Sequence, residues 1–354
     1  MRIGVVGDIH WSKYSSILRL RGEKYSYRLE NCIKSIRWAE DITKNCDLVV
    51  YMGDFFDSSE LNSEEITALS ELSDENNPAW NSVEHLFLVG NHEMGINDLS
   101  FSSSHIFNYL KFNSSNTKST VVSEPMSMFM ADDNCNLCFL PYILEENRQA
   151  LSEYFRTFKS DKTIIFSHND IAGMQMGKFK SVNGFSIEEI QNNCDLFLNG
   201  HLHNGAKVAD KIINVGNLTG QNFSEDAFSY DHSVIILNTD DMKCAVYENP
   251  FALNFYKIDT TTNNFDINTI KNNAVITLKT TLSNQAKYKE LLDNNEKVLV
   301  SRIIIAPEEG MSTSDSTENK EFFAVNHLTK FSEYVLNNIG NSDIIKSELS
   351  EVLS

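Results

Sequence analysis

The sequence predicts an α/β protein, because short buried strands alternate with amphipathic helices. Five apolar runs end abruptly, and four of them end at or next to a glycine. Runs of this kind are typical of strands inside a sheet. Between the first two runs, residues 29–42 carry apolar side chains at helical spacing, so strand, helix and strand form a βαβ unit.

The residues that follow these five runs are of the types that bind metal ions. The central run, residues 48–52, is followed by Gly53, which permits a sharp turn, and then by Asp54. The candidates after the five runs are Asp8, His10, Asp54, Asp57, Asn91, His92, His168, His201 and His203. In open α/β sheets, ligands bind at the carboxyl ends of the strands. Oxygen and imidazole ligands without thiolates suit Mn²⁺, Fe²⁺ or Zn²⁺. One such motif arises easily by chance, but five at strand ends indicate a metal site.

The order of these motifs resembles the calcineurin-like metallophosphoesterase superfamily. The motifs are Asp-x-His, Gly-Asp-x-x-Asp, Gly-Asn-His-Glu, His and Gly-His-x-His, within residues 1–240. The resemblance implies a two-layer β-sandwich flanked by helices, with two metal ions at one edge. It implies that one ion is held by Asp8, His10, Asp54 and His203, and the other by Asp54, Asn91, His168 and His201. It also implies that Asp54 bridges the ions and that His92 is the proton donor, oriented by Asp57.

Phosphodiester hydrolysis requires side chains of these kinds. Two metal ions about 3.5–4 Å apart neutralise charge on the entering and leaving oxygens, and a bound water loses its proton near neutral pH. A histidine near its ordinary pKa is the usual proton donor to the leaving oxygen. We expect Mn²⁺ as the cofactor, while Mg²⁺, Fe²⁺ and Zn²⁺ also fit.

Within the superfamily, the chain is more similar to the SbcD nuclease family than to the phosphoprotein phosphatases. The phosphatases carry glycine after Asp-x-His and Asp-Arg-Gly after the second motif, whereas this chain has Trp11 and Asp57-Ser58-Ser59. Residues 53–57 and 215–226 resemble the SbcD family, in particular its phage recombination endonucleases, although Asn217-Leu218 replaces the usual Ser-Pro or Thr-Pro. The resemblance implies a Mn²⁺-dependent DNA exonuclease and endonuclease subunit of an SbcCD-like complex.

Two other functions compete with this one. The alternative is a metallophosphodiesterase or phosphatase acting on a small nucleotide or a phosphoprotein. A binding module that has lost catalysis is disfavoured, because every ligand and the proton donor are present.

The sequence predicts four segments. Residues 1–250 form the metallophosphoesterase domain, and residues 251–306 form a small α+β capping domain with strand, helix and strand at 274–278, 284–293 and 297–305. Residues 307–320 are acidic and lack periodicity, as in a linker. Residues 321–354 read as two short helices. In SbcD-like proteins a similar element docks on the coiled-coil SbcC-type ATPase; the alternative is that the helices fold back onto their own chain.

Basic residues near the first motif are candidates for gripping a DNA backbone. The net charge is -19, which counts against indiscriminate binding to polyphosphate. The candidates are Lys13, Arg19, Arg21 and Lys24 in the basic run between residues 11 and 28, together with Lys178 and Lys180 in the irregular segment 169–186. The alternative for the run is a solvated loop.

Composition suggests an ordinary cytoplasmic protein, in the host cytoplasm if the gene is carried by a phage. No apolar stretch approaches the ~18 residues that a membrane span requires. The six cysteines suggest no disulfide framework, and Cys135-x-x-Cys138 reads as part of a buried strand. DNA and the ATPase are the expected partners, and a homodimer also fits. Further helices are expected over 63–72 and near 145–158.

Overall fold

The computed structural model describes residues 1–14, 20–72, 80, 83–94, 106–109, 119–155, 162–176 and 179–306. The chain begins with a βαβ unit made of β1 (Arg2–Val6), α1 (Tyr27–Thr43) and β2 (Leu48–Tyr51), in which the two strands are parallel. The hydroxyl of Ser26 accepts a hydrogen bond from Leu29 N and caps the start of α1.

Two six-stranded mixed sheets form the main body. The first has the strand order β14-β13-β1-β2-β3-β4, and the second has the order β11-β12-β10-β7-β6-β5. Their remaining strands are β3 (Glu84–Leu88), β4 (Ser119–Val122), β5 (Met126–Met130), β6 (Cys135–Leu140), β7 (Lys162–Ser167), β10 (Leu196–Asn199), β11 (Ala206–Ala209), β12 (Ile212–Asn214), β13 (Ser233–Asn238) and β14 (Lys243–Glu248). β6 carries Cys135 and Cys138, both buried and free.

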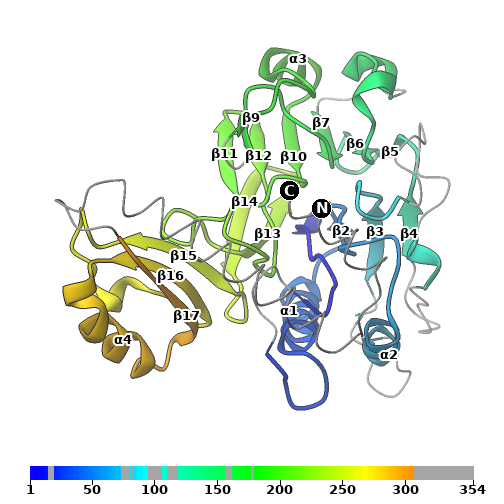
Figure 1. The fold of residues 1–354 in the computed structure, drawn as a ribbon. Helices are drawn as coiled ribbons and strands as arrows, with labels where there is room; N and C mark the ends of the chain where they lie inside the picture. The colour runs from blue at the N-terminus through cyan, green and yellow to red at the C-terminus, as the bar shows by residue number, and fades with distance from the viewer. Residues whose placement is uncertain are drawn as a thin grey trace, which may run out of the picture.

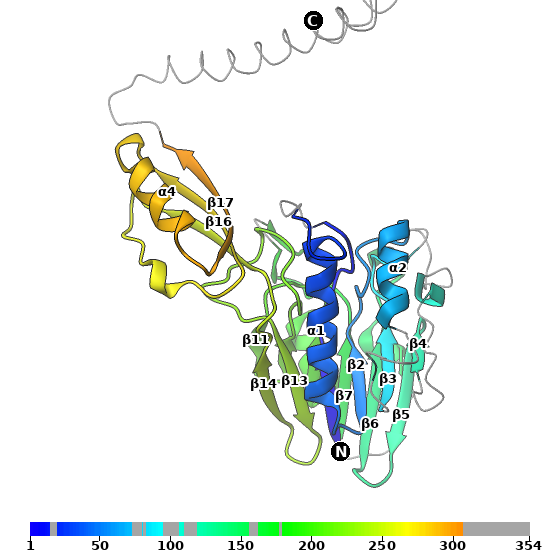
Figure 2. The same ribbon diagram turned by 90° about the horizontal axis from the view of Figure 1, so that it is seen from below.

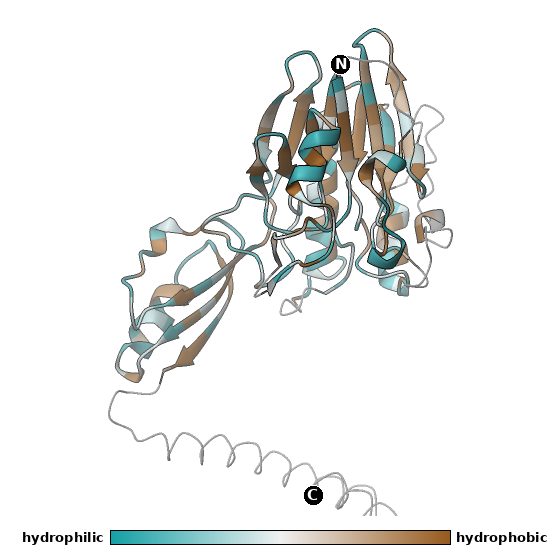
Figure 3. Ribbon diagram, turned by 90° about the horizontal axis from the view of Figure 1, so that it is seen from above, coloured by the Kyte–Doolittle hydropathy of each residue, from teal (hydrophilic) through white to brown (hydrophobic). Residues whose placement is uncertain are grey.

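The sheets pack face to face, and helices cover their outer faces (Figure 1). The first sheet is covered by α1 and α2 (Ser63–Leu72), which lie side by side in Figure 2. The second sheet is covered by α3 (Ile187–Asn193). Between the sheets, the core contains Ile3, Val5, Val50, Leu88, Leu137, Phe139, Phe166 and Leu198. Figure 3 shows these strands as largely hydrophobic. The predicted two-layer sandwich flanked by helices is confirmed.

A small α/β unit follows the sandwich. It consists of β15 (Asn254–Asp259), β16 (Ala274–Thr280), α4 (Gln285–Asp293) and β17 (Val298–Ile305), with all three strands parallel. It lies beside the β13–β14 side of the sandwich (Figure 1). Its first strand contacts the sandwich through a T-shaped packing of Phe223 on Phe255, with ring centroids 5.1 Å apart.

The sequence predicts a helix over residues 145–158, but the described residues 145–155 do not form it. The described part contains two short 3-10 turns, Glu145–Asn147 and Leu151–Glu153. The Glu145 carboxylate accepts hydrogen bonds from the Arg148 side chain and from the distant Gly184 N, so tertiary contacts override the local preference. Residues 169–186 contain a small hairpin of β8 (Gln175–Met176) and β9 (Phe179–Lys180).

Two further predictions concern the C-terminal part and the membrane. The linker 307–320 and the helices 321–354 lie outside the described residues. Among the described residues, no helix is long and apolar enough to cross a membrane.

Candidate metal centre

The predicted ligands meet at one edge of the sandwich, where parallel strands of both sheets end. In the first sheet, Ile9 N and His10 N donate to the carbonyl of Asp54 at 3.0 and 2.9 Å, which fixes the loop after β1 against the loop after β2. In the second sheet, β7 and β10 carry His168 and His201 to the same edge. His201 N donates to Asp8 Oδ1 at 3.3 Å and so joins the two sheets at the site.

We call Asp8, His10 and His203 the first half of the centre. The Nε2 atoms of His10 and His203 lie 3.0 Å apart. One ligand atom from each of the three residues lies within 4.8 Å of the others. Asp8 and His10 are buried, so a cation between these groups would be shielded from water on that side.

We call Asp54, His168, His201 and Asn91 the second half. Asp54 Oδ2 lies 3.2 Å from His168 Nε2, and His201 Nδ1 lies 3.1 Å from Asn91 Oδ1. Asp54, His168 and His201 form another group with ligand atoms within 4.8 Å of one another. Asp54 also connects the halves, because its Oδ2 lies 4.0 Å from His10 Nε2.

The backbone at the ligands is held in an unusual conformation. His10, Asp54 and His201 have left-handed φ angles of 50°, 46° and 69°. Such values are uncommon outside glycine and persist where the surrounding structure enforces them. The site is also crowded: a Cβ added at Gly90 would lie 2.2 Å from Asp54 Oδ1, which explains the glycine before Asn91.

Two divalent cations fit these residues. Asp8 Oδ2 is buried and has no hydrogen-bond partner in the described part of the chain, and His168 Nε2 faces Asp54 Oδ2 at 3.2 Å without forming a hydrogen bond. A buried carboxylate oxygen without a partner is costly, and a bound cation would satisfy it. All donors are oxygen or imidazole nitrogen, which suits Mn²⁺, Fe²⁺ or Zn²⁺.

Charge interactions in the second half are strong. Burial lowers the pKa of His168, but the nearby carboxylates of Asp54 and Asp8 outweigh it and raise the pKa to about 10. Burial raises the pKa of Asp54, but the positive charge of His168 outweighs burial and holds that pKa well below its usual range. Without a metal ion, the carboxylate is therefore ionised and the imidazole carries the positive charge that a cation would replace.

A family match covers this entire site. The sequence profile of the calcineurin-like phosphoesterase (Metallophos) family matches residues 1–205, which is more than half of the chain and contains every predicted metal ligand. The chain belongs to the calcineurin-like phosphoesterase family. It is a metal-dependent phosphoesterase, and its Asp and His clusters are consistent with a two-metal site.

Solved structures that the chain resembles share little sequence with it. They include the purple acid phosphatase PPD1 from yellow lupin (Lupinus luteus) seeds, at 10% identity over 70% of this chain and 52% of that chain, with a TM-score of 0.39. A protein of Thermus thermophilus matches at 12% identity over 70% and 98%, with a TM-score of 0.35. The calcineurin-like phosphoesterase YfkN from Bacillus subtilis matches at 11% over 70% and 88%, with a TM-score of 0.34. The chain spans about half the length of the lupin phosphatase. No curated protein matches it.

His92, the predicted proton donor of this phosphoesterase, lies between the two halves. Its Nε2 is 4.0 Å from Asp54 Oδ2, and its side chain is 37% exposed, so it can reach a substrate. The ring is held by the carbonyl of Asp57, which lies 2.7 Å from Nδ1. The Asp57 carboxylate is 3.9 Å from that nitrogen and is closer to His10 Nδ1, at 3.2 Å. Asp57 thus positions His92 through its backbone, and its side chain contacts the first half.

Sequence reasoning missed two carboxylates that support the histidine ligands. Glu225 Oε1 lies 3.1 Å from His203 Nδ1, and Asp170 Oδ1 lies 3.4 Å from His201 Nε2. Such contacts fix the tautomer and the orientation of a metal-binding imidazole. His203 therefore offers Nε2 to the centre, whereas His201 offers Nδ1. Glu225 lies in the segment that resembles the SbcD family, and this was the only signal for it.

Glu93 is a further residue of the third motif that was given no role. It is fully buried and accepts hydrogen bonds from the backbone N–H groups of Gly90, Asp54 and Phe56, at 2.6, 3.1 and 2.9 Å. Burial and the charge of Asp54 raise the pKa of Glu93 to about 8. This side chain ties the loop that carries Asp54 to the loop that carries His92.

The basic candidates are placed differently from one another. Lys13 lines the same cavity as Asp57, and Lys180 is exposed. Arg21 and Lys24 are exposed but paired with Glu64 and Glu71, respectively. Arg19 and Lys178 lie outside the described residues. Arg28, which belongs to the same basic run, is buried and donates to the carbonyls of Ile9, His10, Thr219 and Gly220, so it is part of the scaffold.

Proposed function

We propose that this phosphoesterase is a Mn²⁺-dependent DNA nuclease subunit of the SbcD type, acting in DNA repair, recombination or phage replication. The observation that carries the proposal is the position of residues 215–226, which resemble the SbcD family. Glu225 of this segment supports His203, and Phe223 packs on Phe255 of the small α/β unit. The segment thus connects the metal centre to the unit that would cap a long substrate.

The chain supplies the groups that in-line hydrolysis of a phosphodiester needs. Two bound cations would neutralise charge on the entering and leaving oxygens and would acidify a water molecule. Asp54 connects the two halves, since its carboxylate contacts His168 and faces His10. His92 is partly exposed and positioned to give the proton on its Nε2 to the leaving oxygen.

The alternative substrate is a small nucleotide or a phosphoprotein. The pairing of Arg21 with Glu64 and of Lys24 with Glu71 favours this alternative, because these cations are already partly neutralised. Exposed pairs of this kind are weak, however, and DNA phosphates would compete with the glutamates for them.

A direct assay separates the two substrates. Purified protein with Mn²⁺ is offered end-labelled linear DNA, a DNA hairpin and bis(p-nitrophenyl) phosphate. The proposal predicts cleavage of the DNA substrates. It also predicts that changing Arg21 and Lys24 to alanine flattens the salt dependence of DNA binding, by about one slope unit for each phosphate that these side chains neutralise. Hydrolysis of the small ester without any cleavage of DNA would reject the nuclease.

We further propose that residues 321–354 bind a coiled-coil ATPase of the SbcC type in the cytoplasm, or in the host cytoplasm for a phage protein. A deletion from Pro307 onward should abolish co-purification with the ATPase and ATP-stimulated cleavage of DNA, and should spare hydrolysis of the small ester. A truncated protein that loses thermal stability would mean that this segment packs on its own chain. Sedimentation of the full chain tests whether it also forms a homodimer.

A further inference from the structure

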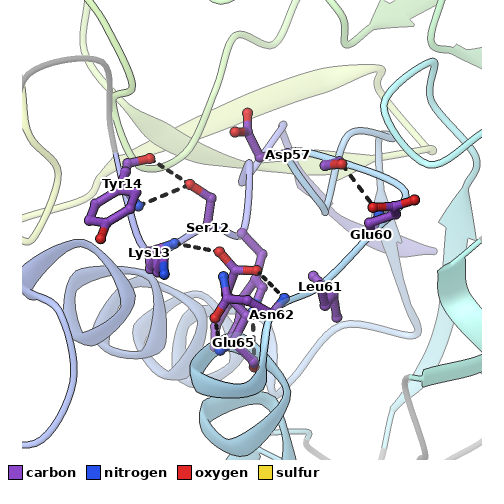
Figure 4. A pocket seen from close by; sticks show the side chains of 10 residues that line it. Ser12, Lys13, Tyr14, Asp57, Glu60, Leu61, Asn62 and Glu65 are labelled. Atoms are coloured by element: carbon purple, nitrogen blue, oxygen red, sulfur yellow. Dashed lines mark hydrogen bonds between the residues drawn. The ribbon is translucent and has the colours of Figure 1, made fainter. Parts of the chain in front are cut away.

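We propose that a cavity beside the metal centre binds the nucleobase of the nucleotide whose phosphate is cleaved. This inference rests on the proposed function to the extent that it requires a nucleotide substrate. The cavity has a volume of about 410 Å³. This size falls in the range of small-ligand sites, about 300–1,000 Å³. It lies between the loop after β1 and the loop after β2 (Figure 4).

The cavity opens next to the reacting groups. Asp57 lines it and also places its Oδ1 3.2 Å from His10 Nδ1 and its carbonyl 2.7 Å from His92 Nδ1. Asp57 therefore contacts both the cavity and the proton donor, His92. For this reason we assign the cavity to the base of the nucleotide that adjoins the scissile phosphate.

The charges of the lining exclude phosphate. Three carboxylates line the cavity, those of Asp57, Glu60 and Glu65, against the single ammonium of Lys13. Glu65 forms a fixed floor, because its two oxygens accept hydrogen bonds from Lys13 N at 2.8 Å and Asn62 N at 3.0 Å. The negative lining repels a phosphate and accepts hydrogen bonds from the amino groups of adenine, cytosine and guanine.

The remaining walls suit a flat ring. Tyr14 is 46% exposed and lies on the side of the cavity opposite Glu60 in Figure 4. Leu61 adds apolar surface, whereas Trp11 is buried and is fixed by a hydrogen bond from its ring N–H to the carbonyl of Glu65. Stacking on an aromatic side chain tolerates any base, since every base has a π face. A base within a duplex is already stacked on its neighbours, so only a nucleotide at a frayed end or one extruded from the duplex can place its base in the cavity.

Substrates without a base test the proposal. We compare cleavage at one bond in two DNA oligonucleotides, of which one carries a tetrahydrofuran residue in place of the nucleotide that adjoins the bond. Stacking predicts that the wild-type protein prefers the intact DNA by about 5- to 100-fold in kcat/KM. In Tyr14→Ala this preference should fall towards one, while Tyr14→Phe should keep it. Tyr247→Ala, which changes an exposed tyrosine on β14, serves as the matched control and should keep the wild-type ratio.

The outcomes separate this inference from the proposed nuclease function. DNA cleavage with equal rates on both oligonucleotides, or an unchanged ratio in Tyr14→Ala, would overturn the base site and leave the nuclease standing. Where DNA is not cleaved at all, deoxyadenosine 5′-p-nitrophenyl phosphate is compared with bis(p-nitrophenyl) phosphate. A wild-type preference for the nucleoside ester that Tyr14→Ala removes would then support the base site and reject the nuclease. No preference on either substrate pair would overturn the base site.

Discussion

The two halves of the metal centre use the same residue types but are supported differently. In the first half, His203 rests on Glu225, whose side chain is 1% exposed. Glu225 also accepts hydrogen bonds from the Asn217 amide and from Gln221 N, at 2.8 and 3.0 Å. In the second half, His201 rests on Asp170, whose side chain is 20% exposed. Ser181 Oγ also contacts the Asp170 carboxylate, at the long distance of 3.5 Å.

This difference indicates which half the fold itself holds in place. The first half is embedded in the scaffold, because Glu225 is buried and the buried Arg28 binds the carbonyls of Ile9 and His10. Asp170 begins the surface segment that contains the β8–β9 hairpin. We therefore expect the first half to be less tolerant of changes in its support than the second.

Asp54→Ala gives the largest expected effect, because it breaks the connection between the halves. A carboxylate that faces both His168 and His10 cannot be replaced by Asp57, whose side chain is directed to His10. We expect loss of at least one metal ion per chain, measured by elemental analysis after dialysis, and loss of all hydrolysis. Asp241→Asn, in the turn between β13 and β14, is the control. Full metal content and activity in Asp54→Ala would mean that Asp54 is not the bridging ligand.

His92→Ala tests whether the residue between the halves is an acid or a ligand. We expect the rate to fall by about 10²–10⁴-fold while the metal content stays nearly intact. An ester with a good leaving group, such as p-nitrophenolate, should lose less than DNA, since it needs no proton. If the variant lost metal instead, His92 would belong to the ligand group that it forms with His10 and Asp54.

The strands and most of the centre could be predicted from the sequence because their signals are local. The apolar run 48–52 and the glycine after it define β2 and its sharp turn, in which Gly53 has a φ of 100°. The helical periodicity of residues 63–72 matches α2 in full. Ligands that directly follow such strands can be predicted without knowing which distant residues they contact.

The remainder depends on contacts between distant parts of the chain. Arg28 belongs to the basic run between residues 11 and 28, but it is buried because its guanidinium donates hydrogen bonds to the carbonyls of Thr219 and Gly220. Asp170 supports His201, although three strands (β8, β9 and β10) and the helix α3 separate them in sequence. The described residues 145–155 do not form the helix predicted over 145–158 for the same reason, because Gly184 N donates a hydrogen bond to the Glu145 carboxylate. No local sequence pattern predicts contacts between residues that lie this far apart in the chain.

Removing the two supporting carboxylates compares the halves directly. Glu225→Gln should lower metal affinity by about 10- to 100-fold, because loss of such a support weakens the imidazole ligand. Asp170→Asn should cost less, since its contact with His201 is longer and more exposed. Calorimetric titration with metal measures the affinity of both variants, and the surface change Glu146→Gln is the control. Equal losses would show that burial of the carboxylate makes no difference to the centre.

The pH dependence of metal binding should sharpen the contrast further. In the metal-free protein, the pKa of His168 is about 10, because the carboxylates of Asp54 and Asp8 outweigh the effect of burial. In the first half, burial lowers the pKa of His10, whereas the Glu225 carboxylate outweighs burial and raises the pKa of His203. A cation in the second half must displace the proton of His168, so its affinity should rise by about tenfold per pH unit up to the pKa of His168, for each proton released. Calorimetric titration with Mn²⁺ between pH 7 and 9, in two buffers of different ionisation enthalpy, counts the protons released. We expect the weaker of two binding events to release more protons and to strengthen with pH. Affinity that does not change over this range would mean that His168 is neutral before the metal arrives.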